Sequence, residues 1–334
     1  MNDIREFLSR RPLLFDGGMG TYYKAAPGIE CERANQTDPA GVQAVHREYL
    51  EAGADAIKTN TFGLPRMAAA HMPGWEALAE AGWKLAEAAA APAGAFVFAD
   101  LGPAPETEAL PAAQVYTAVA EQFRKLGAKN FLFETLSSDA GILEAVRTLK
   151  AAEPDAFVLV SFAVLPDGYT REGLYCKDLV RRMSESGCVD AVGLNCVSAP
   201  GAMRTLARSL SSALPLSVMP NAGYPVVTRT QVRYQGKPDY FAQELSGLAA
   251  DGVVRILGGC CGTTPAHIAA VAERCRTIQP QPIRPKTRTV VSSYGRAVEI
   301  DGPVLIGERI NPTGKSEFKQ ALREGDIGYL LREG

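Results

Sequence analysis

This sequence of 334 residues has little net charge, few histidines and no long apolar runs. Lysine and arginine number 35 against 37 aspartates and glutamates, and the resulting net charge of -2 argues against a nucleic-acid-binding surface. No apolar run approaches the ~20 residues of a membrane span, and residues 1–5 contain no apolar signal core. We therefore expect a cytoplasmic protein that binds neither nucleic acid nor a membrane.

A dinucleotide-binding signature and a disulfide pattern are also missing. No Gly-x-Gly-x-x-Gly motif follows the first apolar run, which disfavours an open doubly wound sheet. The cysteines number seven, an odd count without a disulfide-like spacing, which fits reduced thiols in the cytoplasm. Four of them lack partners at metal-like spacing, and we interpret these as bystanders: Cys31, Cys176, Cys188 and Cys275. We also expect His46, in a helical segment, and His267, at a helix start, to be surface or cap residues rather than ligands.

Short apolar runs alternate regularly with longer amphipathic segments along the chain. Eight runs have the character of buried strands: 13–15, 54–57, 95–98, 130–133, 157–160, 191–194, 216–219 and 253–257. Between them apolar residues recur at helical spacing, as in 39–52 and 114–126, and Gly53 and Gly127 end these two segments. Eight strand–helix units in about 270 residues predict a (β/α)8 TIM barrel, an α/β fold of parallel strands.

Polar residues collect directly after these runs, where the active site of such a barrel lies. They include Asp16, Lys58, Asn60, Thr61, Asp100, Glu134, Ser161, Asn195, Cys196, Asn221, Cys260 and Cys261. Because the carboxyl ends of parallel strands meet at one face of a barrel, we expect these side chains to surround a single site.

The last apolar run ends in Gly-Gly-Cys-Cys-Gly at 258–262. Adjacent strand side chains point to opposite faces, so both sulfurs reach one partner only where glycines let the backbone turn. Two small core residues or a vicinal disulfide are the alternative interpretations. Cys196 ends another apolar run, and three thiolates would bind zinc and leave one tetrahedral position open. A thiol entering that position would lose its proton.

These motifs resemble the homocysteine S-methyltransferase family, and within it the N-terminal homocysteine module of cobalamin-dependent methionine synthases. The resemblance covers residues from about 8 to 275 and is carried by 16–21, 52–55, 59–63, 193–196 and 258–263. It implies that Cys196, Cys260 and Cys261 bind Zn²⁺, with homocysteine in the open position as a thiolate.

The resemblance also implies how the rest of the substrate is held. Asp16 and Glu134 would receive its ammonium group, and backbone groups near Gly17 and Thr61 would hold its carboxylate, with Asn60 lining the pocket. The residues themselves leave ordinary alternatives open. Asp16 can satisfy backbone N–H groups in its glycine-rich turn, and Glu134 can pair with a neighbouring lysine.

The character of the sequence changes after residue 275. We expect the zinc-binding barrel to occupy 1–278 and a proline-rich linker 279–302. The remaining 303–334, read as a strand, a glycine loop and a helix over 316–323, resemble the start of a pterin-binding domain from a longer enzyme. The alternative is a C-terminal arm that packs on the barrel.

The expected activity is zinc-dependent methyl transfer to the thiolate of homocysteine, which gives methionine. No Asp-x-His-x-x-Gly cobalamin motif is present, so methylcobalamin must come from another domain or a corrinoid protein, with methyltetrahydrofolate as the ultimate donor. Direct use of betaine or S-methylmethionine stays open, because relatives that use these donors share the zinc motif. A non-catalytic zinc- or thiol-sensing barrel is the alternative of another class, although a sensor does not need the acidic pair.

Overall fold

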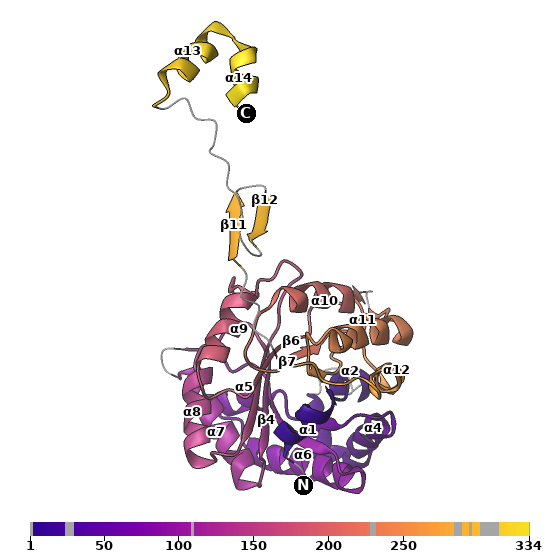
Figure 1. Cartoon of the computed structure of the whole chain (residues 1–334). Coiled ribbons are helices and arrows are strands. Elements are labelled where there is room, and N and C mark those ends of the chain that lie inside the picture. Colours follow the sequence, from indigo (N-terminus) through magenta and orange to yellow (C-terminus); the bar gives the residue numbers. More distant parts are fainter. Residues whose placement is uncertain are drawn as a thin grey trace. The chain divides into compact units, whose positions relative to one another are not determined.

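The computed structural model describes residues 3–23, 30–107, 110–227, 232–283, 289–293, 296–300 and 314–333 (Figure 1). The chain divides into two compact units, Met1–Pro285 and Lys286–Gly334. Among the helices described, none combines the length and the apolar character needed to cross a membrane.

The first unit is built on eight parallel strands. They are β1 (Leu13–Leu14), β2 (Ala56–Lys58), β3 (Phe96–Leu101), β4 (Asn130–Leu136), β5 (Phe157–Phe162), β6 (Ala191–Asn195), β7 (Leu216–Met219) and β10 (Ile256–Leu257). Their order, β1-β10-β7-β6-β5-β4-β3-β2, is closed by a parallel bridge between Phe15 and Ala56. The predicted (β/α)8 barrel is therefore confirmed, and each strand overlaps one of the eight apolar runs.

Helices follow the strands and surround the barrel (Figure 1). They are α1 (Ile4–Arg10), α2 (Met19–Tyr23), α3 (Ala34–Thr37), α4 (Pro39–Glu51), α5 (Leu64–Ala69), α6 (Trp75–Ala90), α7 (Ala112–Lys125), α8 (Ile142–Ala152), α9 (Cys176–Glu185), α10 (Pro200–Ser209), α11 (Pro238–Ala250) and α12 (Pro265–Cys275). Two 3₁₀ turns, Cys31–Arg33 and Ala91–Ala93, and a small ribbon of β8 (Pro225–Val227) and β9 (Val232–Tyr234) complete the unit. Gly53 and Gly127 follow α4 and α7 with φ angles of 100° and 94°, the left-handed conformation expected at helix ends.

Two apolar cores hold the barrel together. The larger lies between the strands and the surrounding helices, and the smaller fills the barrel interior. In the interior the rings of Phe15 and Phe98 lie 4.6 Å apart, and Ile4 and Leu8 of α1 belong to the same core. Because side chains fill the interior, the barrel leaves its loops at the carboxyl ends of the strands to form a binding site.

The second unit contains a hairpin and two helices in its described part. The hairpin pairs β11 (Thr289–Ser293) with β12 (Arg296–Ile300), inside the segment expected to be a linker. The helix expected over 316–323 is α13 (Ser316–Glu324), and α14 (Ile327–Glu333) follows it, with the rings of Phe318 and Tyr329 6.0 Å apart. The strand and glycine loop expected near 304–313 lie outside the described residues.

Candidate active site

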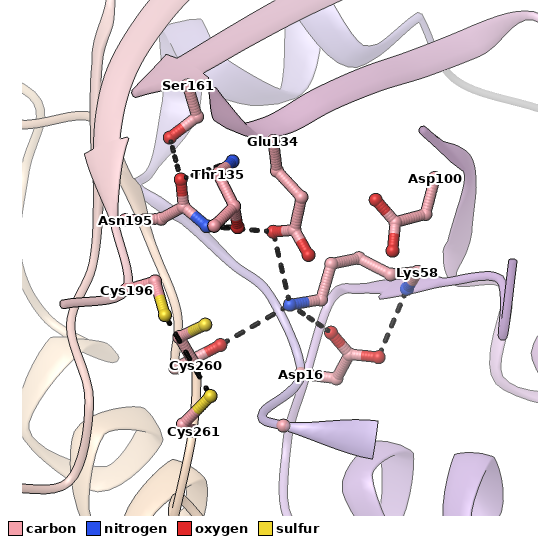
Figure 2. A network of polar contacts seen from close by, with 12 residues as sticks. Asp16, Lys58, Asp100, Glu134, Thr135, Ser161, Asn195, Cys196, Cys260 and Cys261 are labelled. Atoms are coloured by element: carbon pink, nitrogen blue, oxygen red, sulfur yellow. Dashed lines mark hydrogen bonds and ion pairs between the residues drawn. The ribbon is translucent and has the colours of Figure 1, made fainter. Parts of the chain in front are cut away.

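Three cysteines meet at the carboxyl ends of two strands (Figure 2). Cys196 directly follows β6, whereas Cys260 and Cys261 follow β10 after two glycines. Their sulfur atoms all lie within 4.8 Å of one another, and the Sγ atoms of Cys196 and Cys261 are 3.8 Å apart. All three are free thiols that line one pocket, which disfavours both the core-filling and the vicinal-disulfide interpretations.

The backbone at these cysteines is held in unusual conformations by its neighbours. Cys196 and Val197 have φ angles of 57° and 52°, left-handed values that are uncommon for residues other than glycine. The N–H of Cys196 donates to the Met219 carbonyl at 3.0 Å, and the N–H of Cys261 donates to Asn221 Oδ1 at 3.1 Å. The end of β7 thus fixes both cysteine segments in register with each other.

The glycines before the cysteine pair are required by close packing. A Cβ atom on Gly259 would lie 2.4 Å from Thr263 Oγ1, and one on Gly258 would lie 2.7 Å from Phe15 Cβ. Gly262 after the pair has a φ of 77°, and its Cβ position is 2.2 Å from Tyr234 Cβ. Side chains would therefore push the turn that carries Cys260 and Cys261 away from the barrel.

A buried group of charged residues lies beside the thiols. The Lys58 Nζ atom is 3.8 Å from Asp16 Oδ1, 3.7 Å from Glu134 Oε2 and 3.4 Å from the Gly259 carbonyl (Figure 2). None of the three charged side chains exceeds 7% exposure. Asp16 Oδ2 also accepts the backbone N–H of Lys58 at 3.0 Å. The pairing of Glu134 with a lysine is thus observed, whereas the N–H that Asp16 accepts belongs to β2 and not to its own glycine-rich turn.

Asn195 links the acidic group to the thiol group. Its Nδ2 donates to Glu134 Oε2 at 3.2 Å and to Thr135 Oγ1 at 2.8 Å. Its Oδ1 accepts the N–H of Thr135 and the hydroxyl of Ser161, both at 2.9 Å. Both polar atoms of this side chain are thus bonded, and one of these bonds holds Glu134, a role that the sequence motif did not reveal.

A third carboxyl group, Asp100 at the end of β3, was given no role from the sequence. Its side chain lines the same pocket and is 4% exposed, and its Oδ1 atom has no hydrogen-bond partner among the described residues. The only signal for it was its position after an apolar run, which it shares with Asp16 and Glu134.

Burial dominates the electrostatics of these acids. It raises the pKa of Asp16 to about 7 although the Lys58 ammonium opposes the shift, and it also raises the pKa of Glu134. The pKa of Asp100 lies well above its usual range because of burial and the nearby Glu134. Burial lowers the pKa of Lys58, but Glu134 and Asp16 more than offset this and raise it overall. The ammonium group of Lys58 therefore faces three carboxyl groups, which leaves room in the charge balance for a second cation.

The thiols are suited to a cation as well. Hydrogen bonds from Cys196 and Cys260 lower the pKa of Cys261 to about 3, whereas hydrogen bonds to Cys196 and Cys261 raise the pKa of Cys260. A soft divalent ion such as zinc matches a donor set of three sulfurs.

The three thiols line one cavity of about 370 Å³ together with Asp100 and Glu134, whereas Asp16 does not line it. The loop after β2 forms another wall, in which Asn60 Nδ2 donates to the Cys31 carbonyl at 2.9 Å and to Asn35 Oδ1 at 2.9 Å. The N–H of Thr61 donates to the Thr59 carbonyl at 2.9 Å, so this loop is rigidly built.

Gly17, the other residue predicted to lie near the substrate carboxylate, is closely packed and does not line the cavity. A Cβ atom there would lie 2.6 Å from Thr263 Oγ1 and 2.7 Å from the Tyr49 hydroxyl. The next residue, Gly18, lines the cavity, and its N–H donates to Thr263 Oγ1 at 3.0 Å.

Two histidines outside the site had been expected at the surface or at a helix cap. His267 does cap α12, with its Nδ1 atom 3.0 Å from the hydroxyl of the N-cap residue Thr264. The same expectation is wrong for His46, which is 0% exposed in α4. Cys31, interpreted as a bystander, lines the cavity, but within the described chain only the three strand-end cysteines form a metal-like cluster.

Comparison with known proteins places this geometry in context. A family model described as homocysteine S-methyltransferase matches residues 13–275. The methionine synthases of Mycobacterium tuberculosis and Mycobacterium leprae are 33% and 32% identical to the chain over 98% of its length. The chain spans only 30% of each of these relatives.

Solved structures of the Escherichia coli homocysteine methyltransferase MmuM are also similar. The oxidised form matches with a TM-score of 0.67 and 25% identity, covering 82% of this chain and 100% of its own. The metallated form matches with a TM-score of 0.63 over the same shares, and at 24% identity it supports the fold alone.

Proposed function

Because the chain belongs to the homocysteine S-methyltransferase family, we propose that it transfers a methyl group to the sulfur of homocysteine and so forms methionine. The observation that carries the proposal is the meeting of two groups in one cavity: three free thiols and, beside them, buried carboxyl groups. A thiol amino acid carries complementary groups at its two ends. The cavity of about 370 Å³ has room for a molecule of this size.

The metal in this proposal is zinc, held by Cys196, Cys260 and Cys261. The residues fit such an ion, because the three sulfurs already lie within 4.8 Å of one another and face the cavity. Three protein ligands leave a position for a substrate, as in catalytic zinc sites. When bound, zinc would lower the pKa of the substrate thiol and so supply a nucleophilic sulfur near neutral pH.

The other residues of the cavity would orient the substrate. In this proposal Asp16 and Glu134 attract its ammonium group, and backbone groups near Gly17 and Thr61 hold its carboxylate. Asn60 would keep the loop after β2 in place, since its side chain is bound to Cys31 and Asn35. Fixing both ends of a short substrate leaves its sulfur one orientation, which favours in-line attack on a methyl group.

We further propose that the methyl group comes from a corrinoid carried by another domain or protein, with methyltetrahydrofolate as its ultimate source. The similarity to the two mycobacterial methionine synthases supports this, because it extends over 98% of the chain. The MmuM structures cover only 82% of it. In this proposal 1–278 form the homocysteine-binding barrel, 279–302 a linker, and 303–334 the start of a pterin-binding-like domain.

Offering methyl donors one at a time tests the proposed activity. Zinc-loaded protein should convert homocysteine to methionine with methylcobalamin, and the matched Cys261→Ala protein should not. Conversion with betaine or S-methylmethionine instead would show that the chain is a direct methyltransferase. Binding of zinc and homocysteine without methyl transfer from any donor would favour the sensing barrel.

A further inference from the structure

The donors and acceptors of the acidic group leave a specific place for a second cation. Lys58 Nζ carries three N–H donors, and three oxygens surround it: Asp16 Oδ1, Glu134 Oε2 and the Gly259 carbonyl. Asp16 Oδ2 is used by the backbone N–H of Lys58, and Glu134 Oε2 also accepts from Asn195. Lys58 thus balances part of this negative charge, but Asp16 Oδ1 is buried and accepts no hydrogen bond from the described residues.

An incoming ammonium group brings three more N–H donors, which need acceptors because the site is buried. Glu134 retains its second oxygen, Oε1, to which no described residue donates a hydrogen bond. No described residue donates a hydrogen bond to either carboxyl oxygen of Asp100, and the Oδ1 atom is buried. A buried acceptor that is left unpaired is unfavourable, so a ligand that donates a hydrogen bond to it is favoured.

The backbone of Asp100 is fixed so that its side chain faces this place. Asp100 lies on β3, between β2, which carries Lys58, and β4, which carries Glu134. Two hydrogen bonds fix its backbone. The N–H of Asp100 donates to Thr59 Oγ1 at 3.0 Å, and its carbonyl accepts a hydrogen bond from the Thr61 hydroxyl at 2.9 Å. Figure 2 shows the carboxyl group turned toward Glu134 and Lys58.

We propose that Asp100 is a further substrate-binding residue, which receives the α-ammonium group of homocysteine together with Asp16 and Glu134. This inference rests on the proposed function and refines it, because Asp100 adds a third carboxyl group to the acidic pair. The raised pKa of Asp100 agrees with an acid that lacks a counter-ion until the substrate brings one. Asp100 thereby makes the site selective for amino-acid thiols.

Calorimetric titration with two ligands tests this role without measuring activity. Homocysteine and 4-mercaptobutanoate share the thiol, the chain length and the carboxylate, and differ only in the ammonium group. In zinc-loaded protein of the full 334 residues, Asp100→Asn should lower the preference for homocysteine at least tenfold and leave the Kd of 4-mercaptobutanoate within about twofold. Asp178→Asn, at an exposed acid of α9, is the matched control and should change neither value.

Each other result contradicts a distinct part of the reasoning. Equal weakening of both ligands by Asp100→Asn, or no weakening of either, would overturn the role of Asp100 while leaving the proposed function intact. Absence of homocysteine binding by the unsubstituted zinc-loaded protein would overturn the proposed function as well. If Asp100→Asn does not fold, Asp100→Glu provides the same test, because a displaced carboxylate should again weaken only the ammonium-bearing ligand.

Discussion

Replacing Asp16 by asparagine should change how the stability of the barrel depends on pH. Burial raises the pKa of this carboxyl group in the folded protein from 3.8 to about 7, whereas the unfolded chain keeps the ordinary value. Between these values the folded state holds a proton that the unfolded state has lost. The stabilisation is therefore complete below pH ~4 and disappears as the pH rises through about 7.

The size of the effect follows from the shift. A pKa raised from 3.8 to about 7 corresponds to about 4 kcal/mol, at 1.36 kcal/mol for each unit. Integrated from pH 5 to pH 8, the contribution falls by about 2.5 kcal/mol. Asparagine has the shape of the protonated acid but does not titrate. The stability of the unsubstituted protein relative to Asp16→Asn should thus fall by about 2.5 kcal/mol over this range.

Urea unfolding at several pH values measures this difference. Both tryptophans, Trp75 and Trp83, lie in α6, so their fluorescence reports on the barrel. Chelator and reductant keep both proteins metal-free and reduced at every pH. A difference that stays constant from pH 5 to pH 8, or that grows in favour of the unsubstituted protein, would refute the assigned electrostatics of Asp16.

Three further results are expected. Purified protein should hold about one zinc ion per chain with sulfur ligands at ~2.3 Å, and Cys261→Ala should lose the metal but keep its circular dichroism; stoichiometric zinc in that variant would remove Cys261 from the ligand set. Homocysteine binding near pH 7 should release close to one proton, since a free thiol has a pKa of roughly 8.5; calorimetry in buffers of different ionisation enthalpy would show zero release if the substrate stays a thiol. Removal of 303–334 should leave zinc content and homocysteine affinity nearly unchanged, and a loss of more than about tenfold (~1.4 kcal/mol) would show that this segment supports the barrel.

The barrel was predictable because its signals are local. Each apolar run of β character became a strand, and glycines such as Gly53 and Gly127 ended helices where their φ freedom was needed. The thiol cluster was predictable for a related reason: residues directly after parallel strands meet at one face of a barrel. The three cysteines, far apart in sequence, therefore came together within 4.8 Å.

The roles of individual polar side chains could not be read in the same way, because they depend on distances between strands. Nothing in the sequence indicates that Lys58 lies between Asp16 and Glu134. It also does not indicate that both ends of the Asn195 amide form hydrogen bonds with residues of neighbouring strands. The only signal for Asp100 in the sequence was its position directly after an apolar run. These contacts are set by the register of β2, β3, β4 and β6, which the apolar pattern does not specify.

His46 and the hairpin of the second unit show two other limits. His46 lies four residues after Val42 and three before Tyr49, so the apolar face of α4 did indicate its burial, but the polar character of its ring outweighed this signal in the prediction. The hairpin of β11 and β12 was missed because the prolines before it suggested an extended linker. The β-branched residues Thr289, Val290 and Val291 were the available signal for a strand.

X-ray absorption at the zinc edge tests the central claim of a thiolate-activating metal site most directly. Zinc-loaded protein alone should show three sulfur neighbours at ~2.3 Å, from Cys196, Cys260 and Cys261. Addition of homocysteine at a saturating concentration, verified by calorimetry, should raise the number to four at the same distance. A count that remains at three with homocysteine bound would contradict the claim that this site activates the substrate sulfur on the metal.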